Sequence, residues 1–596
     1  MQRWVQGFLV GALVVGSFFT SQAQILFTAA MDGAQETPPN ASTAQGTLWA
    51  VLSSDMSTLT YQLTFAQLSA QATGMHFHVG VPGVSGPVVF PISFSGNTAS
   101  GTWSNVPDTI VQHLIKGELY ANVHSSNFPG GEIRGRLTLA PGMGFTISAD
   151  QAQETPPTGS AGTGTGYAFI DSLGNQLTYR ITVAGLSDTV TGSHFHAGAV
   201  GVPGGVVHPI SFTDSLSSGG WTGFADSIYG LLARDHIYFN IHTKAHPGGE
   251  IRGVLASVTG QRFAIRLNGA QETPPNNETG HATGWAILSA DGSSLTFRST
   301  FAGLTGPVTG SHLHAGAPGV AGSVVHPFTP VGNTASSVWS SPADSILRAL
   351  LEGDVYMNFH TSAHPGGEIR GQLVPASAIE LIIGLNASQE SGVTSPGTGT
   401  GYGLLDSLGR KLSYEVTVAA LSDTLTAAHF HLGAPGVNGG VVEPVAFTDS
   451  TSAGEWTGYP DADISGFVKG AYYFNVHTKA HPGGEIRGQM VFEPSVLTSV
   501  TPVGASVPRA FSLEQNYPNP FNPSTVIEFS LTAPARVTLK VFNVIGQQVA
   551  TLVDDARAAG VYRTTFNAGS LASGVYFYRL STNGGQQLTR RMLLLK

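Results

Sequence analysis

Histidines recur in this sequence in an arrangement that suits metal binding. A His-x-His pair occurs four times, and a third histidine follows each pair within an Asn-x-His sequence. Three imidazoles are a familiar ligand set for zinc or copper. We therefore predict about one zinc or copper ion for each set. The four sets are His76, His78 and His124; His194, His196 and His242; His312, His314 and His360; and His429, His431 and His477.

Strand geometry would bring the three rings of a set together. Residues i and i+2 of a strand point to the same face, so His194 and His196 project together while Phe195 points the other way. In the closing block, Asn240 and His242 likewise share a face. Neighbouring strands could then assemble the three imidazoles. The alternative is a hydrogen-bonded polar network that fixes the sheet, and it would include the recurring asparagines Asn122, Asn240, Asn358 and Asn475.

Other histidines are candidates for a fourth ligand. Three of them precede a Pro-Gly-Gly turn in copies two to four: His246, His364 and His481. Phe128 stands at this position in the first copy, so the fourth ligand there is water, or this histidine lies outside the coordination shell. His208 and His326 are weaker candidates, because Phe90 and Glu443 occupy the equivalent positions.

The histidine sets belong to a long internal repeat. Gln-Glu-Thr-Pro-Pro begins at Gln35, Gln153 and Gln271, and a decayed copy begins at Gln389. Each copy contains several strand-like runs separated by turn residues, and one short helical run such as 345–351. This pattern predicts an all-β protein of four tandem antiparallel β-sandwich modules. The modules span residues 25–140, 142–258, 260–376 and 378–492, here called modules 1 to 4.

Each module ends on Gly-Gly-Glu-Ile-Arg-Gly, for which we favour a structural role. The glycines permit a turn with positive φ. Glu250 and Arg252 would then share a strand face and pair with each other or with Glu154. A catalytic carboxylate would need a nucleophile or a substrate cleft, and no serine elbow, phosphate loop or dinucleotide fingerprint accompanies the motif.

These three motifs, in this order and at this pitch, resemble the CHRD domain, named for chordin. The resemblance covers residues 25–492 in four copies and implies a secreted, sandwich-like module. The histidine layout is also similar to the copper site of Cu/Zn superoxide dismutases. It departs from that site in having no bridging histidine with an aspartate and no disulfide cysteines, and shared layout does not confer activity.

The N-terminus is typical of a secretory signal peptide over residues 1–23. Arg3 supplies a positive charge, residues 8–19 are apolar, and Ser21-Gln22-Ala23 fits a cleavage site. The apolar run is short for a membrane span, and no later segment is long and apolar enough, so we expect no transmembrane anchor. The chain has no cysteine, which excludes disulfides, thiolate metal sites and a lipoprotein anchor.

A linker rich in Ser, Val, Thr and Pro follows at about residues 493–508, and a different domain occupies residues 509–596. Its opening, Phe511 to Pro523, contains Asn-Pro-Phe-Asn-Pro and resembles the type A sorting domain of bacterial type IX secretion. The resemblance implies a small immunoglobulin-like β-sandwich, passage through the outer membrane and the type IX machinery as a partner. Whether this domain is removed after export stays open.

The charge of the chain argues against one further class of function, nucleic-acid binding. Only 11% of residues are charged and the net charge is −10, without a basic patch, so we expect no nucleic-acid partner. We favour a non-enzymatic, multi-module binding protein that is secreted or held on the outer cell surface, with an unknown extracellular ligand. The alternatives are a secreted copper or zinc metalloenzyme and a purely structural surface spacer.

Overall fold

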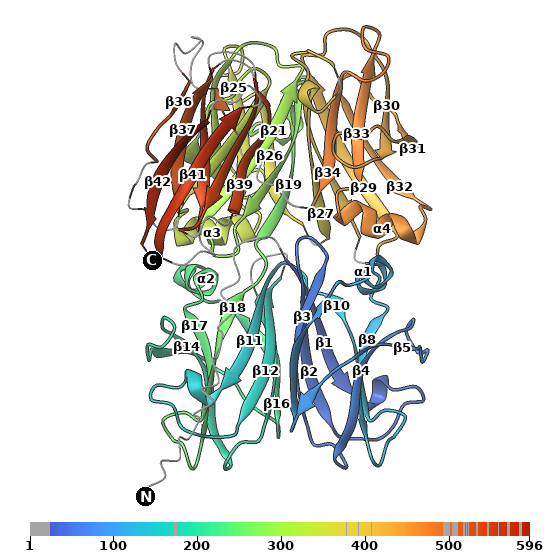
Figure 1. The fold of residues 1–596 in the computed structure, drawn as a ribbon, viewed down its shortest axis with the longest axis vertical. Helices are drawn as coiled ribbons and strands as arrows, with labels where there is room; N and C mark the ends of the chain where they lie inside the picture. Colours follow the sequence, from blue (N-terminus) through green and yellow to red (C-terminus); the bar gives the residue numbers. More distant parts are fainter. Residues whose placement is uncertain are drawn as a thin grey trace, which may run out of the picture. The chain divides into compact units, whose positions relative to one another are not determined.

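The computed structural model confirms an all-β chain of four repeat modules and a C-terminal β domain (Figure 1). The predicted signal peptide lies outside the described residues, as does the linker apart from residues 501–502. The structure describes residues 24–171, 176–376, 378–390, 392–406, 408–492, 501–502, 511–516, 519, 521, 524–531, 535–544, 548–557, 560–568, 573–582 and 587–595.

Each module is built on one antiparallel sheet whose strand order is the same in all four copies. In module 2 the order is β15-β14-β17-β18-β11-β12-β13-β16. The strands of module 2 are β11 Met143–Asp150, β12 Thr163–Ile170, β13 Gln176–Ala184, β14 Val190–Ala197, β15 Gly205–Pro209, β16 Leu216–Thr222, β17 Ile237–Thr243 and β18 Ile251–Ser257.

The other modules repeat these strands with small variations. In module 1 they are β1 Ile25–Asp32, β2 Gln45–Leu52, β3 Thr58–Ala66, β4 Ala72–Val79, β5 Val88–Pro91, β6 Phe94–Ser95, β7 Thr98–Ser104, β8 Leu119–Ser125, β9 Ile133–Arg136 and β10 Thr138–Leu139. In module 3 they are β19 Gln261–Asn268, β20 His281–Leu288, β21 Ser294–Ala302, β22 Val308–Ala315, β23 Ser323–Pro327, β24 Thr334–Ser340, β25 Val355–Thr361 and β26 Ile369–Pro375. In module 4 they are β27 Ile379–Asn386, β28 Thr398–Leu405, β29 Lys411–Ala419, β30 Leu425–Leu432, β31 Gly440–Val445, β32 Thr451–Thr457, β33 Tyr472–Thr478 and β34 Ile486–Val491.

Each module also has one short α-helix, as the sequence predicts, and a single 3₁₀ turn at its Gln-Glu motif. The α-helices are α1 Asp108–Ile115, α2 Asp226–Ala233, α3 Asp344–Leu351 and α4 Asp461–Val468. The 3₁₀ turns are η1 Gly33–Gln35, η2 Gln151–Gln153, η3 Gly269–Gln271 and η4 Ala387–Gln389.

The sheet of each module curls over a core formed by alternate residues of its strands. On β13, Leu177, Tyr179, Ile181 and Val183 are buried, which is the period of two that a strand with one buried face requires. The outermost strands β15 and β16 approach each other where His208 stacks on Trp221, with ring centroids 4.8 Å apart. The two halves of the curled sheet therefore face one another as the two layers of a sandwich.

The Glu of the closing motif is a buried structural anchor. Glu250 is fully buried and accepts hydrogen bonds from the Ser160 and Thr243 hydroxyls at 2.6 and 2.5 Å. It also accepts from the backbone N–H and the hydroxyl of Ser187, at 2.6 and 2.9 Å. Of the two predicted alternatives, the pairing of Glu250 with Arg252 is wrong, because these short polar side chains reach the carboxylate and Arg252 lies over the Tyr238 ring. The charge of Arg252 acts on Glu154 instead and lowers the pKa of that carboxyl against the effect of burial. The Glu250 carboxylate ties two distant loops to β17.

The C-terminal domain has two four-stranded sheets, ordered β35-β40-β37-β36 and β39-β38-β41-β42, which confirms the predicted small sandwich. Buried Phe529, Val541 and Leu580 lie in its core. Among the described residues of the chain, no helix is long and apolar enough to cross a membrane. The strands of this domain are β35 Thr501–Pro502, β36 Ser512–Leu513, β37 Ser524–Leu531, β38 Ala535–Phe542, β39 Gln548–Arg557, β40 Gly560–Asn567, β41 Gly574–Thr582 and β42 Gln587–Leu594.

Candidate metal centre

The three histidines of each set converge on the outer face of the sheet. In module 2, β14 and β17 are antiparallel neighbours, with His194 opposite Asn240 and Gly192 opposite His242. The ring centroid of His194 lies 5.6 Å from that of His196 and 5.3 Å from that of His242. In all four modules, one ligand nitrogen from each of the three rings lies within 4.8 Å of the others. One ion could therefore contact all three imidazoles.

Backbone carbonyls select which nitrogen of two rings faces the centre. His196 Nδ1 lies 3.0 Å from the Gly204 carbonyl oxygen, and His242 Nδ1 lies 3.0 Å from that of Pro247. A carbonyl only accepts, so each ring donates from Nδ1–H and keeps a lone pair on Nε2. A backbone carbonyl that orients a histidine in this way is typical of metal sites.

The nitrogens that face the centre are buried and lack protein partners. His194 Nδ1, His196 Nε2 and His242 Nε2 have no hydrogen-bond partner in the part of the chain that the structure describes. The same three atoms of module 3, on His312, His314 and His360, are in the same state. Buried polar atoms normally find a partner. Three such atoms around one point match the donor set that a zinc or copper ion needs.

In modules 1 and 4, two rings of the same centre lie within hydrogen-bond distance of each other. His76 Nδ1 lies 3.2 Å from His124 Nε2, and His429 Nδ1 lies 3.2 Å from His477 Nε2. In both modules the Nε2 atom of the middle histidine, His78 or His431, is buried without a partner among the described residues. The same nitrogens therefore face the centre in every copy.

Electrostatics favour the neutral form of the two imidazoles on β14. Burial lowers the pKa of His194 and of His196 below the ordinary value of 6.5, and the neighbouring imidazoles lower it further. A second proton on either ring would sit beside another ring that can carry charge. At neutral pH the rings therefore offer lone pairs, which is the form that binds metal. Protons would compete with a bound ion only on the acid side of neutrality.

A stacked tyrosine and arginine support the middle histidine. The Tyr238 ring stacks on His196 with centroids 4.9 Å apart, and Arg252 Cζ lies 3.4 Å from the centroid on the Tyr238 ring. The Gly204 N–H donates to the Tyr238 hydroxyl at 2.9 Å, and Arg252 donates to the Val202 carbonyl at 3.0 Å. Together they fix the loop whose carbonyl orients His196. Sequence reasoning placed Tyr238 on the same strand face as His242 but gave it no role, although the tyrosine recurs in every copy as Tyr120, Tyr238, Tyr356 and Tyr473.

The recurring asparagine belongs to a separate network. Asn240 Nδ2 donates to Glu154 Oε1 at 2.7 Å, and Glu154 belongs to the Gln-Glu-Thr-Pro-Pro motif. Burial raises the pKa of Glu154, and in modules 1 and 3 it raises that of Glu36 and Glu272 to about 7. In module 2 the hydrogen bond joins Asn240 to Glu154, and the buried nitrogens of the three histidines have no partner among the described residues.

The remaining candidate histidines lie elsewhere. His246 belongs to none of the four histidine clusters found among the described residues. His364 Nε2 lies 3.2 Å from Glu278 Oε1. His208 and His326 stack on Trp221 and Trp339, each at 4.8 Å between centroids. Phe90 makes the equivalent stack on Trp103 at 4.5 Å, which explains why a phenylalanine can replace the histidine there.

Fold and site together define an array of β-sandwich modules, each carrying a three-histidine cluster. The sequence matches the CHRD domain over residues 27–137, 145–255, 263–373 and 382–490. The chain belongs to the CHRD domain family. Residues 515–594 match the secretion system C-terminal sorting domain. The protein is therefore a multidomain protein exported by type IX secretion to the outer cell surface or the medium.

Comparison with individual proteins adds little beyond the family. The chain is 27% identical to chordin of Xenopus laevis over 171 residues, which are 26% of this chain and 18% of chordin. A crystal structure of dimeric latent PorU from Porphyromonas gingivalis aligns with 56% of this chain and 34% of its own, at 9% identity and a TM-score of 0.13. The eight N-terminal Ig domains of Down Syndrome Cell Adhesion Molecule align with 90% of this chain and 74% of their own, at 8% identity and a TM-score of 0.11.

Proposed function

We propose that this exported protein binds metal ions, one zinc or copper ion in each CHRD module, and uses them to bind an extracellular ligand. The observation that supports the proposal is the set of three imidazole nitrogens that face one point in each module. Among the described residues, all three are buried without a partner in modules 2 and 3, and two of them hydrogen-bond to each other in modules 1 and 4. Neutral imidazole suits both metals, and copper binds more tightly in the general affinity order. Metal supply would therefore decide which ion the protein carries.

Three protein ligands leave a coordination position for another molecule. Zinc in structural sites usually has four protein ligands, whereas a site with three keeps a position open. A carboxylate or imidazole of a partner could occupy that position. Four such sites on one chain would raise the overall affinity for a ligand with several donor groups through effective concentration.

A titration of the full-length mature protein tests this function. Metal-free protein is titrated with zinc or copper in competition with a chromophoric chelator at neutral pH. We expect four equivalents per chain, and we expect protons to displace the ions as the pH falls below the ordinary histidine pKa. Absence of any stoichiometric binding would support the structural-spacer alternative. Turnover of a redox or hydrolytic substrate by the metal-loaded protein would instead favour the metalloenzyme alternative.

A further inference from the structure

Modules 1 and 2 pack through sheet faces that are self-complementary. Two buried hydroxyl pairs link β2 and β3 to β12 and β13: Thr47 with Thr182, and Thr64 with Thr165, each at 2.7 Å between oxygens. Thr47 and Thr165 are the same position of the repeat, and so are Thr64 and Thr182. The two contacts are thus one contact made twice with the modules exchanged. This reciprocity defines an isologous, two-fold interface.

Modules 3 and 4 repeat the same interface. Thr283 Oγ1 lies 2.8 Å from that of Thr417, and Thr300 Oγ1 lies 2.8 Å from that of Thr400. These four residues are the repeat equivalents of the four threonines of modules 1 and 2. A contact that recurs atom for atom in a second pair is a property of the module surface, and chain connectivity alone does not account for it.

A second self-complementary face joins the two pairs through their helices (Figure 1). Helices α2 and α3 exchange ion pairs: Arg234 with Asp344 at 2.8 Å, and Arg348 with Asp226 at 2.9 Å. Helices α1 and α4 make such an exchange with repeat-equivalent lysines. Their ion pairs join Lys116 to Asp461, at 2.7 Å, and Lys469 to Asp108. At the end of α3, by contrast, Glu352 stands at the position of Arg234, and Arg348 lies four residues before it. Exposed ion pairs contribute little to stability, so they serve to align the packed helices.

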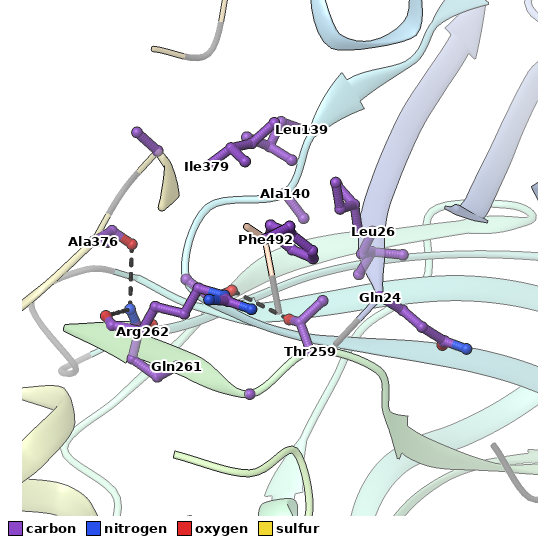
Figure 2. A pocket seen from close by; sticks show the side chains of 14 residues that line it. Gln24, Leu26, Leu139, Ala140, Thr259, Gln261, Arg262, Ala376, Ile379 and Phe492 are labelled. Atoms are coloured by element: carbon purple, nitrogen blue, oxygen red, sulfur yellow. Dashed lines mark hydrogen bonds between the residues drawn. The ribbon is translucent and has the colours of Figure 1, made fainter. Parts of the chain in front are cut away.

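The four modules meet at a common centre. Figure 2 shows the side chains that line a pocket there. The cavity has a volume of about 70 Å³, and its lining includes Leu26 of module 1, Gly142 of module 2, Thr259 between modules 2 and 3, Arg262 of module 3 and Phe492 of module 4. Arg262 lies over the Phe492 ring, with 4.3 Å between Cζ and the centroid. Residues that are distant in the sequence therefore meet at this one junction.

At this junction, one position of the repeat carries different residue types in the pair of modules 1 and 2 and in the pair of modules 3 and 4. Leu26, Gly144, Arg262 and Glu380 occupy the same position of the four modules. A Cβ atom on Gly144 would lie 2.6 Å from Leu26 Cδ2, so glycine there makes room for the leucine. Glu380 is fully buried, and the nearby Arg262 charge lowers its pKa while burial raises it to about 8. Leucine fits glycine in one pair, and a buried glutamic acid lies near an arginine in the other.

We propose that the CHRD region is a tetramer within one chain. Each module binds two others through two different self-complementary faces, so the four modules close into one assembly with pseudo-222 symmetry. The partner that each face fits is another copy of the same module, and closure uses all eight faces. The histidine centres lie on β14, β17 and their equivalents, and strands β18 and β11 separate them in the sheet from β12 and β13. The assembly therefore holds four sites in fixed positions without covering them.

Engineered disulfides in the full-length protein test this pairing, because the natural chain has no cysteine. The matched variant carries Thr64→Cys and Thr165→Cys, at hydroxyls 2.7 Å apart, which is within reach of a disulfide. The mismatched control carries Thr64→Cys and Thr283→Cys, where Thr283 is the equivalent of Thr165 in module 3. We expect at least about tenfold more intramolecular disulfide in the matched variant, since the control thiols meet only through loose tethering. Peptide mass spectrometry identifies the linked residues.

A surface pair keeps the test valid if buried cysteines disturb folding. Asp226→Cys with Arg348→Cys places both thiols at exposed helix positions for a short bis-maleimide, and Asp226→Cys with Lys469→Cys is the mismatched control. Preferential cross-linking of the matched pair supports the closed assembly. Equal cross-linking of matched and mismatched pairs, or none in either, would overturn the closed assembly. The modules would then be independent domains that only the chain connects.

Discussion

Replacing His194, His196 and His242 together with alanine is expected to remove one of four metal ions and to leave the other three in place. Among the described residues, these three rings form the only cluster of potential metal ligands in module 2, so their removal should leave the ion without protein ligands. The single change His196→Ala is expected to weaken binding at this module at least about 100-fold, because loss of even a supporting residue costs 10–100-fold. Chelator competition at neutral pH measures both effects.

A neighbouring histidine provides the matched control. His246 recurs in three modules and follows β17 closely, yet it lies outside the cluster. The variant His246→Ala is expected to retain four ions with unchanged affinity. Circular dichroism of each variant without metal shows whether the fold is intact. Equal losses in the His246→Ala and His196→Ala variants, or four ions in the triple variant, would contradict the assignment.

The second large effect is on stability and comes from Glu250→Ala. This fully buried carboxylate accepts four hydrogen bonds, from Ser160, Ser187 and Thr243. Hydrogen bonds to charged groups contribute about 1.5–3 kcal/mol each, and the buried Thr243 hydroxyl would be left without its acceptor. We expect the apparent free energy of unfolding of module 2 to fall by about 3 kcal/mol or more, measured by urea denaturation.

The pH dependence of this stability follows from the sign of the pKa shift. Burial alone would raise the pKa of Glu250, but the hydrogen bonds from Ser160, Thr243 and Ser187 outweigh it and hold the pKa below its ordinary value of 4.5. The stabilisation is therefore complete above about pH 4.5 and is lost as the pH falls through the lower, folded-state value. Glu250→Ala should flatten this acid loss for module 2. The exposed Asp188→Ala serves as a control, and equal stability of both variants would show that Glu250 anchors nothing.

Short-range periodicity made much of this protein predictable from its sequence. The i, i+2 rule placed His194 and His196 on one face, and repetition identified His242 as the third member of the set. The prediction was weaker where loops decide the contact. Nothing local to Glu250 indicates that Ser160 and Ser187, 90 and 63 residues away, would reach it. The same holds for the Gly204 carbonyl, which orients His196 only because the loop after β14 folds back on Tyr238.

The contacts between modules could not be predicted from the sequence either. Thr64 and Thr165 read as ordinary strand residues, since threonine favours strands wherever they lie. Their burial follows from a second module packing on the same face, which no pattern within one repeat reveals. The charge difference between Arg262 and Glu380 is visible in the sequence, but its meaning appears only when both lie at one junction.

Anomalous diffraction at the absorption edge of the added metal, on crystals of the full-length protein, tests the central claim most directly. Four peaks are predicted, one in each CHRD module. Each should be bonded to Nδ1 of the first histidine and to Nε2 of the other two, at about 2.0–2.1 Å for zinc. Peaks centred on His246, His364 and His481, or no peak within any of the four clusters, would contradict the account.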